Sequence, residues 1–156
     1  MKKLYYVLLM ALPVLYFASC DDDNNLLDVD VSIQVDGGVS VDGKIYVVQG
    51  DTLKVESINV INNEEGKEAI ITSATYSWDY RYAGVSITPP FGAQFVTDDM
   101  PLGQHLMQIE CPLYAVDKSP AMMYMAYKVD IVETADDIPD GVASTIVKVD
   151  PGIKEN

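Results

Sequence analysis

The amino-acid sequence predicts an all-β sandwich of about seven to eight strands, and three observations lead to this prediction. Short runs of alternating apolar and polar residues recur at a spacing of about 8–12 residues. Gly, Pro, Asn and Asp separate these runs. No window after the first 28 residues repeats its apolar positions with the 3.6-residue period of a helix. The length of 156 residues fits one domain.

The first half of the domain contains three predicted strands. Residues 29–35 (VDVSIQV) alternate without a break, which is typical of a strand with one buried face, and Asp36-Gly37-Gly38 ends this strand. A second strand is expected at 44–48 (KIYVV). The third, 52–61 (TLKVESINVI), changes the parity of its apolar residues part-way. A β-bulge near Glu56-Ser57 would reconcile the two parities.

The second half begins with a turn at 62–67 (NNEEGK). Residues 74–82 (ATYSWDYRY) are predicted to form one strand that places alternate aromatic residues, 76 to 82, on one face, with Trp78 in the core. Residues 84–90 are expected to be irregular because Pro89-Pro90 cannot continue a ladder. Further strands are expected at 93–97, 105–111, 123–133 and 145–149.

Three pieces of the sequence resemble immunoglobulin-like and PKD-type domains of bacterial surface proteins. Residues 47–53 (VVQGDTL) resemble their Gly-Asp entry into the second strand. Residues 76–80 (YSWDY) resemble the strand whose tryptophan fills the core, and 101–107 (PLGQHLM) the lead into the penultimate strand. The resemblance implies an immunoglobulin-like or PKD-like sandwich over residues 29–133.

The chain also departs from these families. YRYAG replaces the Gly-Asp-Gly that follows the tryptophan strand of PKD domains, and the disulfide of antibody domains is absent. The resemblance transfers no catalytic or binding residue, because such folds host many functions. Residues 134–156 are expected to form a C-terminal extension, either one edge strand or a tail.

The N-terminus reads as a secretory signal peptide over residues 1–19. Two lysines precede an apolar run at 4–17, and the small residues Ala18-Ser19 follow it. The run is shorter than the roughly 20 apolar residues of a transmembrane helix. Residues 17–20 (FASC) resemble the bacterial lipobox, which implies cleavage before Cys20 and acylation of this cysteine. The alternative is ordinary cleavage that leaves Cys20 as a spare thiol.

The residues after the cysteine give a second indication of where in the cell the protein is located. Asp21, Asp22 and Asp23 resemble the acidic export tag of surface lipoproteins in the Bacteroidota, which implies an anchor in the outer membrane and exposure at the cell surface. Residues 20–28 then form an acidic tether. One alternative is an anchor that faces the periplasm, because an aspartate directly after the cysteine resembles the inner-membrane retention signal of enteric bacteria. The other alternative is a solvated linker that carries no localisation signal.

The charge excludes one class of partner. Ten basic residues face 24 acidic ones, a net charge of −14. Removal of residues 1–19, which hold two lysines and no acid, leaves eight basic residues and a net charge of −16. Because such a surface repels phosphate backbones, we expect no nucleic-acid partner.

The sequence offers little catalytic or metal-binding chemistry. His105 is the only histidine, and no nucleophile elbow, phosphate loop or zinc motif is present. We therefore predict no enzyme, no catalytic residue, no cofactor and no metal site, with His105 structural. The acidic loops 98–99 and 136–140 suit calcium by ligand type but lack EF-hand spacing, so solvated loops are favoured. Cys111 is expected to be a buried free thiol.

The remaining candidates are aromatic. Tyr80, Tyr82, Tyr114 and Tyr124 lie near strand ends or on the expected outer parity, where exposed rings can stack against sugars. The main hypothesis is a non-enzymatic surface lipoprotein that binds a glycan or an envelope protein. The alternative is a structural or accessory subunit of a fimbrial or nutrient-uptake assembly, in which strand 123–133 offers an edge to a partner. A small glycan-active enzyme is the third hypothesis.

Overall fold

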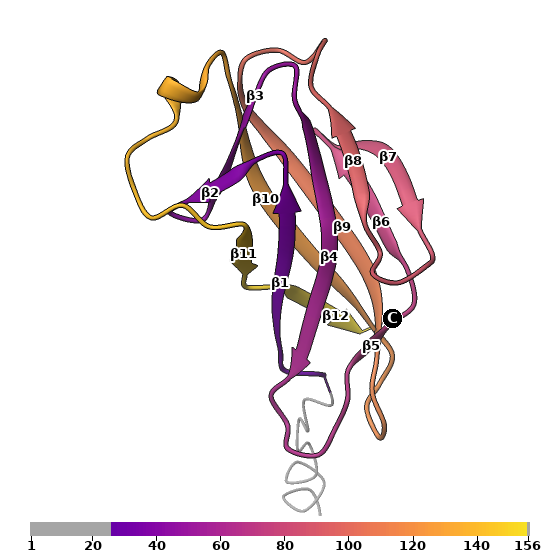
Figure 1. The fold of residues 1–156 in the computed structure, drawn as a ribbon. Coiled ribbons are helices and arrows are strands. Elements are labelled where there is room, and N and C mark those ends of the chain that lie inside the picture. The colour runs from indigo at the N-terminus through magenta and orange to yellow at the C-terminus, as the bar shows by residue number, and fades with distance from the viewer. Residues whose placement is uncertain (1–25, 156) are drawn as a thin grey trace, which may run out of the picture.

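The computed structural model describes residues 26–155 as a two-layered β-sandwich (Figure 1). Sheet A has four strands in the order β11-β1-β4-β8, and sheet B has eight, in the order β2-β3-β10-β9-β6-β7 with β12 on β10 and β5 on β9. The only helix in this range is a single 3-10 turn, η1 (Ala135–Asp137). The strands of sheet A are β1 (Val29–Asp36), β4 (Thr52–Asn62), β8 (Ala93–Val96) and β11 (Ile146–Val149). Those of sheet B are β2 (Val39–Val41), β3 (Lys44–Val48), β5 (Ile70–Ile71), β6 (Ala74–Trp78), β7 (Arg81–Ser86), β9 (Gly103–Tyr114), β10 (Ala121–Val132) and β12 (Gly152–Glu155).

The strand order is that of an immunoglobulin-like sandwich. With β1, β4, β6, β8, β9 and β10 taken as strands A, B, C, E, F and G, A-B-E lie in one sheet and C-F-G in the other. After β1 the chain crosses to sheet B, where β3 pairs in parallel with β10, Ile45 opposite Val129. The other pairs of described strands are antiparallel. The predicted all-β sandwich is therefore confirmed, although short added pieces raise the strand number to twelve within residues 26–155.

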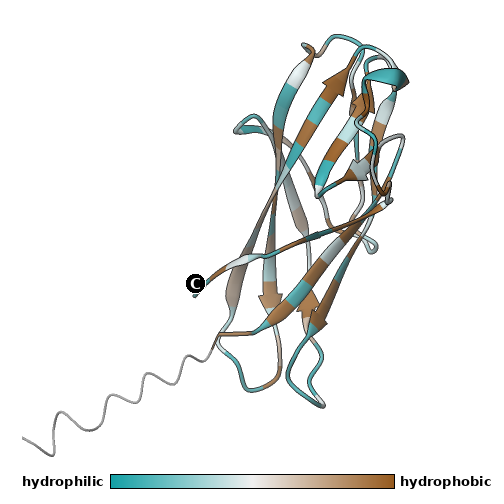
Figure 2. Cartoon of the chain, turned by 90° about the vertical axis from the view of Figure 1, so that its left-hand side faces the viewer, coloured by the Kyte–Doolittle hydropathy of each residue, from teal (hydrophilic) through white to brown (hydrophobic). Residues whose placement is uncertain are grey.

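The core lies between the two sheets and is filled by the alternate residues that the sequence pattern indicated. Figure 2 shows apolar and polar bands alternating along the strands. The inward-facing residues of β1, β9 and β10 are almost fully buried. Alternate residues along each of these strands are apolar, and their side chains point toward the opposite sheet. The largest buried side chains include Ile33, Leu53, Tyr76, Met107, Ile109, Met123, Tyr127 and Ile131.

The bulge expected in the third strand is present. Gln34 of β1 lies opposite Ser57 of β4, and the next residue, Val35, lies opposite Val55. Glu56 is therefore the extra residue. The bulge lets Leu53 and Val55 on one side of it, and Ile58 on the other, face the core despite their opposite parity.

The single strand predicted at 74–82 is wrong. β6 ends at Trp78, and Asp79 and Tyr80 form a tight turn with φ of 49° and 64° before β7 begins. Two successive positive φ angles are the mark of a type I′ hairpin turn. Residues 84–90 were expected to be irregular, but residues 84–86 belong to β7, the strand that follows the turn. Tyr76 points into the core, whereas Tyr82 points to solvent.

The C-terminal segment belongs to both sheets. β11 pairs with β1, and β12 pairs with the first residues of β10. Val147 is buried in the core, so this segment, for which one edge strand or a tail was expected, supplies two strands and part of the packing. Leu27, placed in the expected tether, is buried as well.

The strand expected to offer an edge is internal. β10 has β9 along its whole length on one side and β12 and then β3 on the other. The outermost strands of the described sheets are instead β7 and β2 in sheet B, and β8 and β11 in sheet A, and Ser40 of β2 forms an isolated bridge with Ser144.

Candidate functional site

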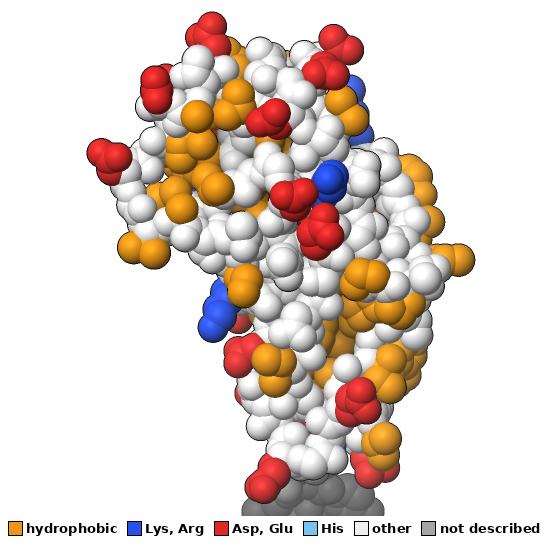
Figure 3. Space-filling view, viewed as in Figure 1, with side chains coloured by type: hydrophobic (Ala, Val, Ile, Leu, Met, Phe, Trp, Pro, Cys, Tyr) orange, Lys and Arg blue, Asp and Glu red, His pale blue; other side chains and the backbone are white. Residues whose placement is uncertain are grey.

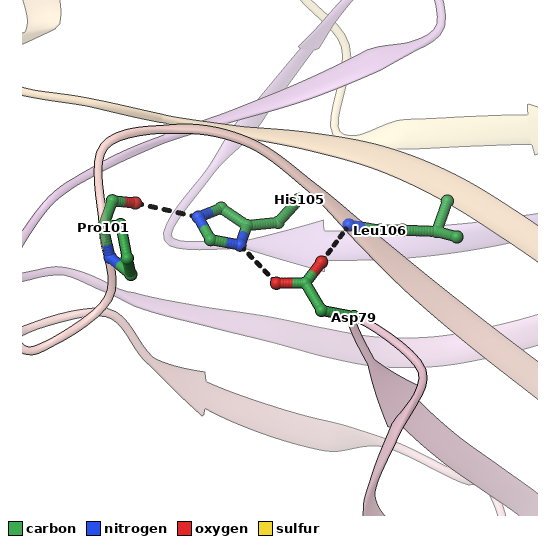
Figure 4. A network of polar contacts seen from close by, with 4 residues as sticks. All are labelled: Asp79, Pro101, His105 and Leu106. Carbon is green, nitrogen blue, oxygen red and sulfur yellow. Dashed lines mark hydrogen bonds and ion pairs between the residues drawn. The ribbon is translucent and has the colours of Figure 1, made fainter.

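A part-buried polar network fixes the β6–β7 turn against the start of β9. The Nδ1 of His105 lies 2.7 Å from Oδ2 of Asp79, and its Nε2 lies 2.8 Å from the carbonyl oxygen of Pro101 (Figure 4). The other carboxylate oxygen of Asp79 accepts the Leu106 N–H at 2.9 Å. Trp78 covers the imidazole, with the ring centroids 5.5 Å apart. The network thus joins three segments that are distant in sequence.

The partners of His105 determine its protonation. An ionised carboxylate and a carbonyl oxygen only accept hydrogen bonds, so both ring nitrogens must donate, which only the imidazolium does. Burial is the largest single influence and disfavours this charge. The hydrogen bond to Asp79, helped by the Pro101 carbonyl and the charges of Asp79 and Asp130, outweighs burial and raises the pKa of His105.

The pKa of Asp79 moves in the complementary direction. Burial, the largest influence, favours the neutral acid. The hydrogen bonds from His105 and the Leu106 N–H, with the charges of His105 and Arg81, exceed it and lower the pKa of this carboxyl. The charged forms of the two groups therefore stabilise each other as an ion pair, most fully between the ordinary values of their pKa, 3.8 and 6.5.

The hairpin held by this pair presents two of the four predicted tyrosines. Tyr80 is 80% exposed at the tip of the turn, and Tyr82 is 70% exposed on β7. Exposed aromatic rings on a fixed turn are available for contact with a ligand, because holding them still removes part of the ordering cost of binding.

Register places the other two tyrosines on the same sheet. Tyr82 lies opposite Ser77 of β6, which lies opposite Gln108 of β9, so all three side chains project from the outer face of sheet B. Tyr124 of β10 lies opposite Glu110 and projects from this face too. Tyr114 also projects outward, but at the far end of β9 beside Ile70. The structure thus brings Tyr82 and Tyr124 to one face, with Tyr80 at its margin and Tyr114 apart from them.

Sequence reasoning missed the polar residues between these tyrosines. Thr75, Ser77 and Gln108 are half-buried on the outer face, and Ala126 lies beside Gln108 on β10. The only signal in the sequence was the outward parity of three strands, which cannot be combined before the strand order is known.

The described residues do not form a metal-binding cluster. No group of three or more His, Cys, Asp or Glu suited to a metal ion occurs between residues 26 and 155. Asp137 caps η1, where its carboxylate accepts from the backbone N–H and hydroxyl of Thr134. Cys111 is fully buried, as predicted, and burial raises the pKa of its thiol to about 12.

The surface on the sheet A side is different in kind. Figure 3 shows acidic side chains scattered over this side and apolar side chains along the margin that carries β7 and β8. Exposed residues of that margin include Tyr82, Val85, Ile87 and Val96.

Comparison with known proteins does not assign the chain to a family. No protein-family model, no curated protein and no solved structure matches it. Within the part of the chain that the structure describes, no helix has the length and apolar character needed to cross a bilayer. The predicted lipidation site, Cys20, and the predicted tag, Asp21 to Asp23, lie outside the described residues.

Proposed function

We propose that this protein is a non-enzymatic, lipid-anchored binding module of the cell surface. The observation that carries the proposal is the exposure of Tyr80 and Tyr82 on a hairpin that the part-buried Asp79–His105 pair holds in place. Two exposed rings on an ordered hairpin offer stacking surface to a ligand at a reduced ordering cost. The ligand is a glycan or an envelope protein.

The position of the chain ends supports an anchored orientation. The described chain starts at the end of the sandwich that also carries the β4–β5 loop and the β9–β10 hairpin (Figure 1). The β6–β7 turn lies toward the other end. An acyl group on Cys20, followed by the acidic residues 21–23, would anchor the domain with this turn directed away from the bilayer. We place the anchor in the outer membrane, facing outward, with a periplasm-facing anchor as the alternative.

The chemistry of the described residues supports binding over catalysis. Both nitrogens of His105 are engaged, so it has no free position from which to take a proton from a substrate. The thiol of Cys111 is buried and protonated at neutral pH.

The anchor is tested by comparing the full chain with Cys20→Ala in a Bacteroidota host. A fatty-acid probe should label only the wild type, and protease added to intact cells should remove it. Labelled protein that resists protease would contradict surface exposure and favour the periplasm-facing alternative. Absence of label would contradict the anchor.

The binding face is tested on the same cells with a photoreactive amino acid at Ala126. This position is exposed at the centre of the outer face of sheet B. The matched control carries the photoreactive residue at Ser32, on the outer face of sheet A. Crosslinks from position 126 alone support the proposal, whereas equal crosslinking from both positions, or none, contradicts it.

A second candidate function is that of an assembly subunit. The observation that favours it is the free edge of β7, where Tyr82, Val85 and the following Ile87 are exposed. A partner strand could extend sheet B at this edge. Chemical crosslinking on intact cells should then give a ladder or a defined heteromer, and a monomer without crosslinked neighbours would exclude this function.

A further inference from the structure

The name trough is used here for a set of neighbouring residues on the outer face of sheet B. Its floor consists of Thr75 and Ser77 of β6, Gln108 of β9 and Ala126 of β10. Tyr82 of β7 stands at one side and Tyr124 of β10 at the other. Three polar residues and one alanine thus lie between two exposed tyrosine rings.

The register gives the span of the trough. Tyr82 lies in the same cross-strand row as Ser77, Gln108 and Ala126, and Tyr124 lies one row away. Three interstrand steps and one two-residue step place the two tyrosine backbones about 16 Å apart. Tyrosines whose backbones are this far apart suit an extended ligand that contacts both, not a single small molecule.

The orientation of Tyr124 is supported from behind. The Nζ of Lys154, on β12, lies 5.3 Å from the centroid of the Tyr124 ring. β12 pairs with β10 on the side opposite β9, so this contact comes from outside the trough. The cation–π contact restricts the ring, which stays 37% exposed.

The floor offers hydrogen bonds that the domain does not use. The side chains of Thr75, Ser77 and Gln108 are half-buried and make no hydrogen bond to another described residue. Glu110, also on the outer face, adds an exposed carboxylate acceptor beside Thr75. Hydroxyls, an amide and one carboxylate together match a ligand that carries many hydroxyl groups.

The charge on this face separates ligand classes. Strand residues whose register turns them outward on sheet B include three lysines (Lys44, Lys128, Lys154) and two acids (Glu110, Asp130), whereas the whole chain carries −14. Lys44 and Asp130 pair with each other at 3.0 Å. Glu110 lies opposite the floor residue Thr75, and Lys128 lies two residues from the floor residue Ala126 on the same face. One charge of each sign borders the floor, so neither an anionic nor a cationic chain is favoured there. The face is suited to an uncharged ligand.

The distribution of apolar surface argues against a protein partner here. Protein interfaces have an apolar centre and a polar rim. The trough has the reverse order, with Ser77 and Gln108 at the centre and tyrosines at the flanks. Pyranose rings have apolar faces that stack on tyrosine and hydroxyl edges that reach polar floors.

We propose that the trough binds an uncharged polysaccharide, which stacks sugar rings on Tyr82 and Tyr124 and hydrogen-bonds to Ser77 and Gln108 between them. This inference rests on the proposed function of the protein as a binding module and names its ligand class.

The test is affinity electrophoresis of the full chain, in mild detergent, through gels that contain a neutral glucan, a neutral mannan, a neutral xylan or anionic polygalacturonate. At least one neutral polymer should retard the wild type, and polygalacturonate should not. Calorimetry with an oligosaccharide of the retarding polymer then gives affinities. Tyr82→Ala and Tyr124→Ala should each weaken binding at least about fivefold, because each removes one stacking surface.

Conservative variants and one matched control keep the result specific. Tyr82→Phe and Tyr124→Phe keep the ring and should bind within about twofold of wild type. Tyr114→Ala removes an exposed tyrosine of the same face outside the trough and should have no effect.

Several results would overturn the inference. They are retardation by no neutral polymer, retardation only by the anionic polymer, and an equal effect of Tyr82→Ala and Tyr114→Ala. If the photoreactive residue at position 126 captures one defined protein instead, the ligand class proposed here is wrong, while the binding-module function stands. If neither a polysaccharide nor a protein is captured, both proposals fail.

Discussion

The Oδ2 of Asp79 lies 2.7 Å from the Nδ1 of His105, and this contact joins the β6–β7 turn to the start of β9 across 26 residues of sequence. The turn has no glycine, although both of its central residues have positive φ. Its conformation is therefore supported from outside the hairpin, by His105 and by the Leu106 N–H that Asp79 also binds. The exposed tyrosines of this hairpin thus depend on an ion pair that responds to pH.

The first prediction is that His105 stabilises the fold less at high pH. The pKa of His105 is raised above its ordinary value of 6.5, so its contribution is fully present below pH 6.5 and is lost as pH rises through the raised value. The pKa of Asp79 is lowered from 3.8, so its contribution is present above that pH and is lost on further acidification. The pair should contribute most between pH 4 and 6.5.

The measurement is urea unfolding of the wild type and of His105→Gln at pH 5.5 and pH 9. The difference in the free energy of unfolding should be larger at pH 5.5. Tyr114→Ala, which lies far from the pair, serves as the control for general effects of pH. A difference between wild type and His105→Gln that does not change with pH would contradict the ion pair.

The fold was predictable from sequence wherever the alternation of apolar and polar residues within a single strand determines which face of that strand is buried. The parity change in 52–61 indicated the bulge, and Glu56 is the extra residue. The hairpin at 79–80 was not predictable in this way. Tyr76, Trp78, Tyr80 and Tyr82 continue a period of two through the turn, and the contact that stabilises positive φ at Asp79 comes from a distant strand.

The candidate site was predictable only in part, for a related reason. Four tyrosines were identified by parity and position, but parity does not say which strands are neighbours. β7, β6, β9 and β10 lie in this order, so Tyr82 and Tyr124 share a face with Ser77 and Gln108 between them. Tyr114 has the same parity on β9 as Gln108, yet lies at the other end of that strand.

The second prediction contrasts two glycines that share a positive φ. Gly37 has a φ of 71°, and a Cβ there would lie 2.0 Å from the carbonyl oxygen of Thr52. Gly43 has a φ of 77° but faces open space. Gly43→Ala should cost about 1 kcal/mol from backbone strain alone. Gly37→Ala should cost roughly 3 kcal/mol or more, or prevent folding, because backbone must also move. Thermal and urea unfolding measure both, and equal losses would contradict the close approach of β4 to the turn.

The third prediction concerns Cys111. Its side chain is fully buried, and burial raises the pKa of the thiol to about 12, so the reactive thiolate is scarce at pH 8. Iodoacetamide should leave Cys111 unmodified in the native Cys20→Ala variant and modify it fully in urea, as measured by mass spectrometry of the tryptic peptide. Rapid modification of the native protein would show that β9 opens or that its inward face is misassigned.

The fourth prediction tests whether the C-terminal segment is integral to the domain. Val147 of β11 is 1% exposed in the core, whereas its neighbour Ile146 is 55% exposed. Val147→Ala removes buried methyl groups and leaves a cavity, and should lower the free energy of unfolding by about 2 kcal/mol. Ile146→Ala changes a larger side chain on the same strand and should alter stability by no more than about 0.5 kcal/mol. Urea unfolding of both variants measures the difference. If Val147→Ala is as mild as Ile146→Ala, the segment after residue 133 contributes little to the core, and β11 is an appended strand and not part of the sandwich.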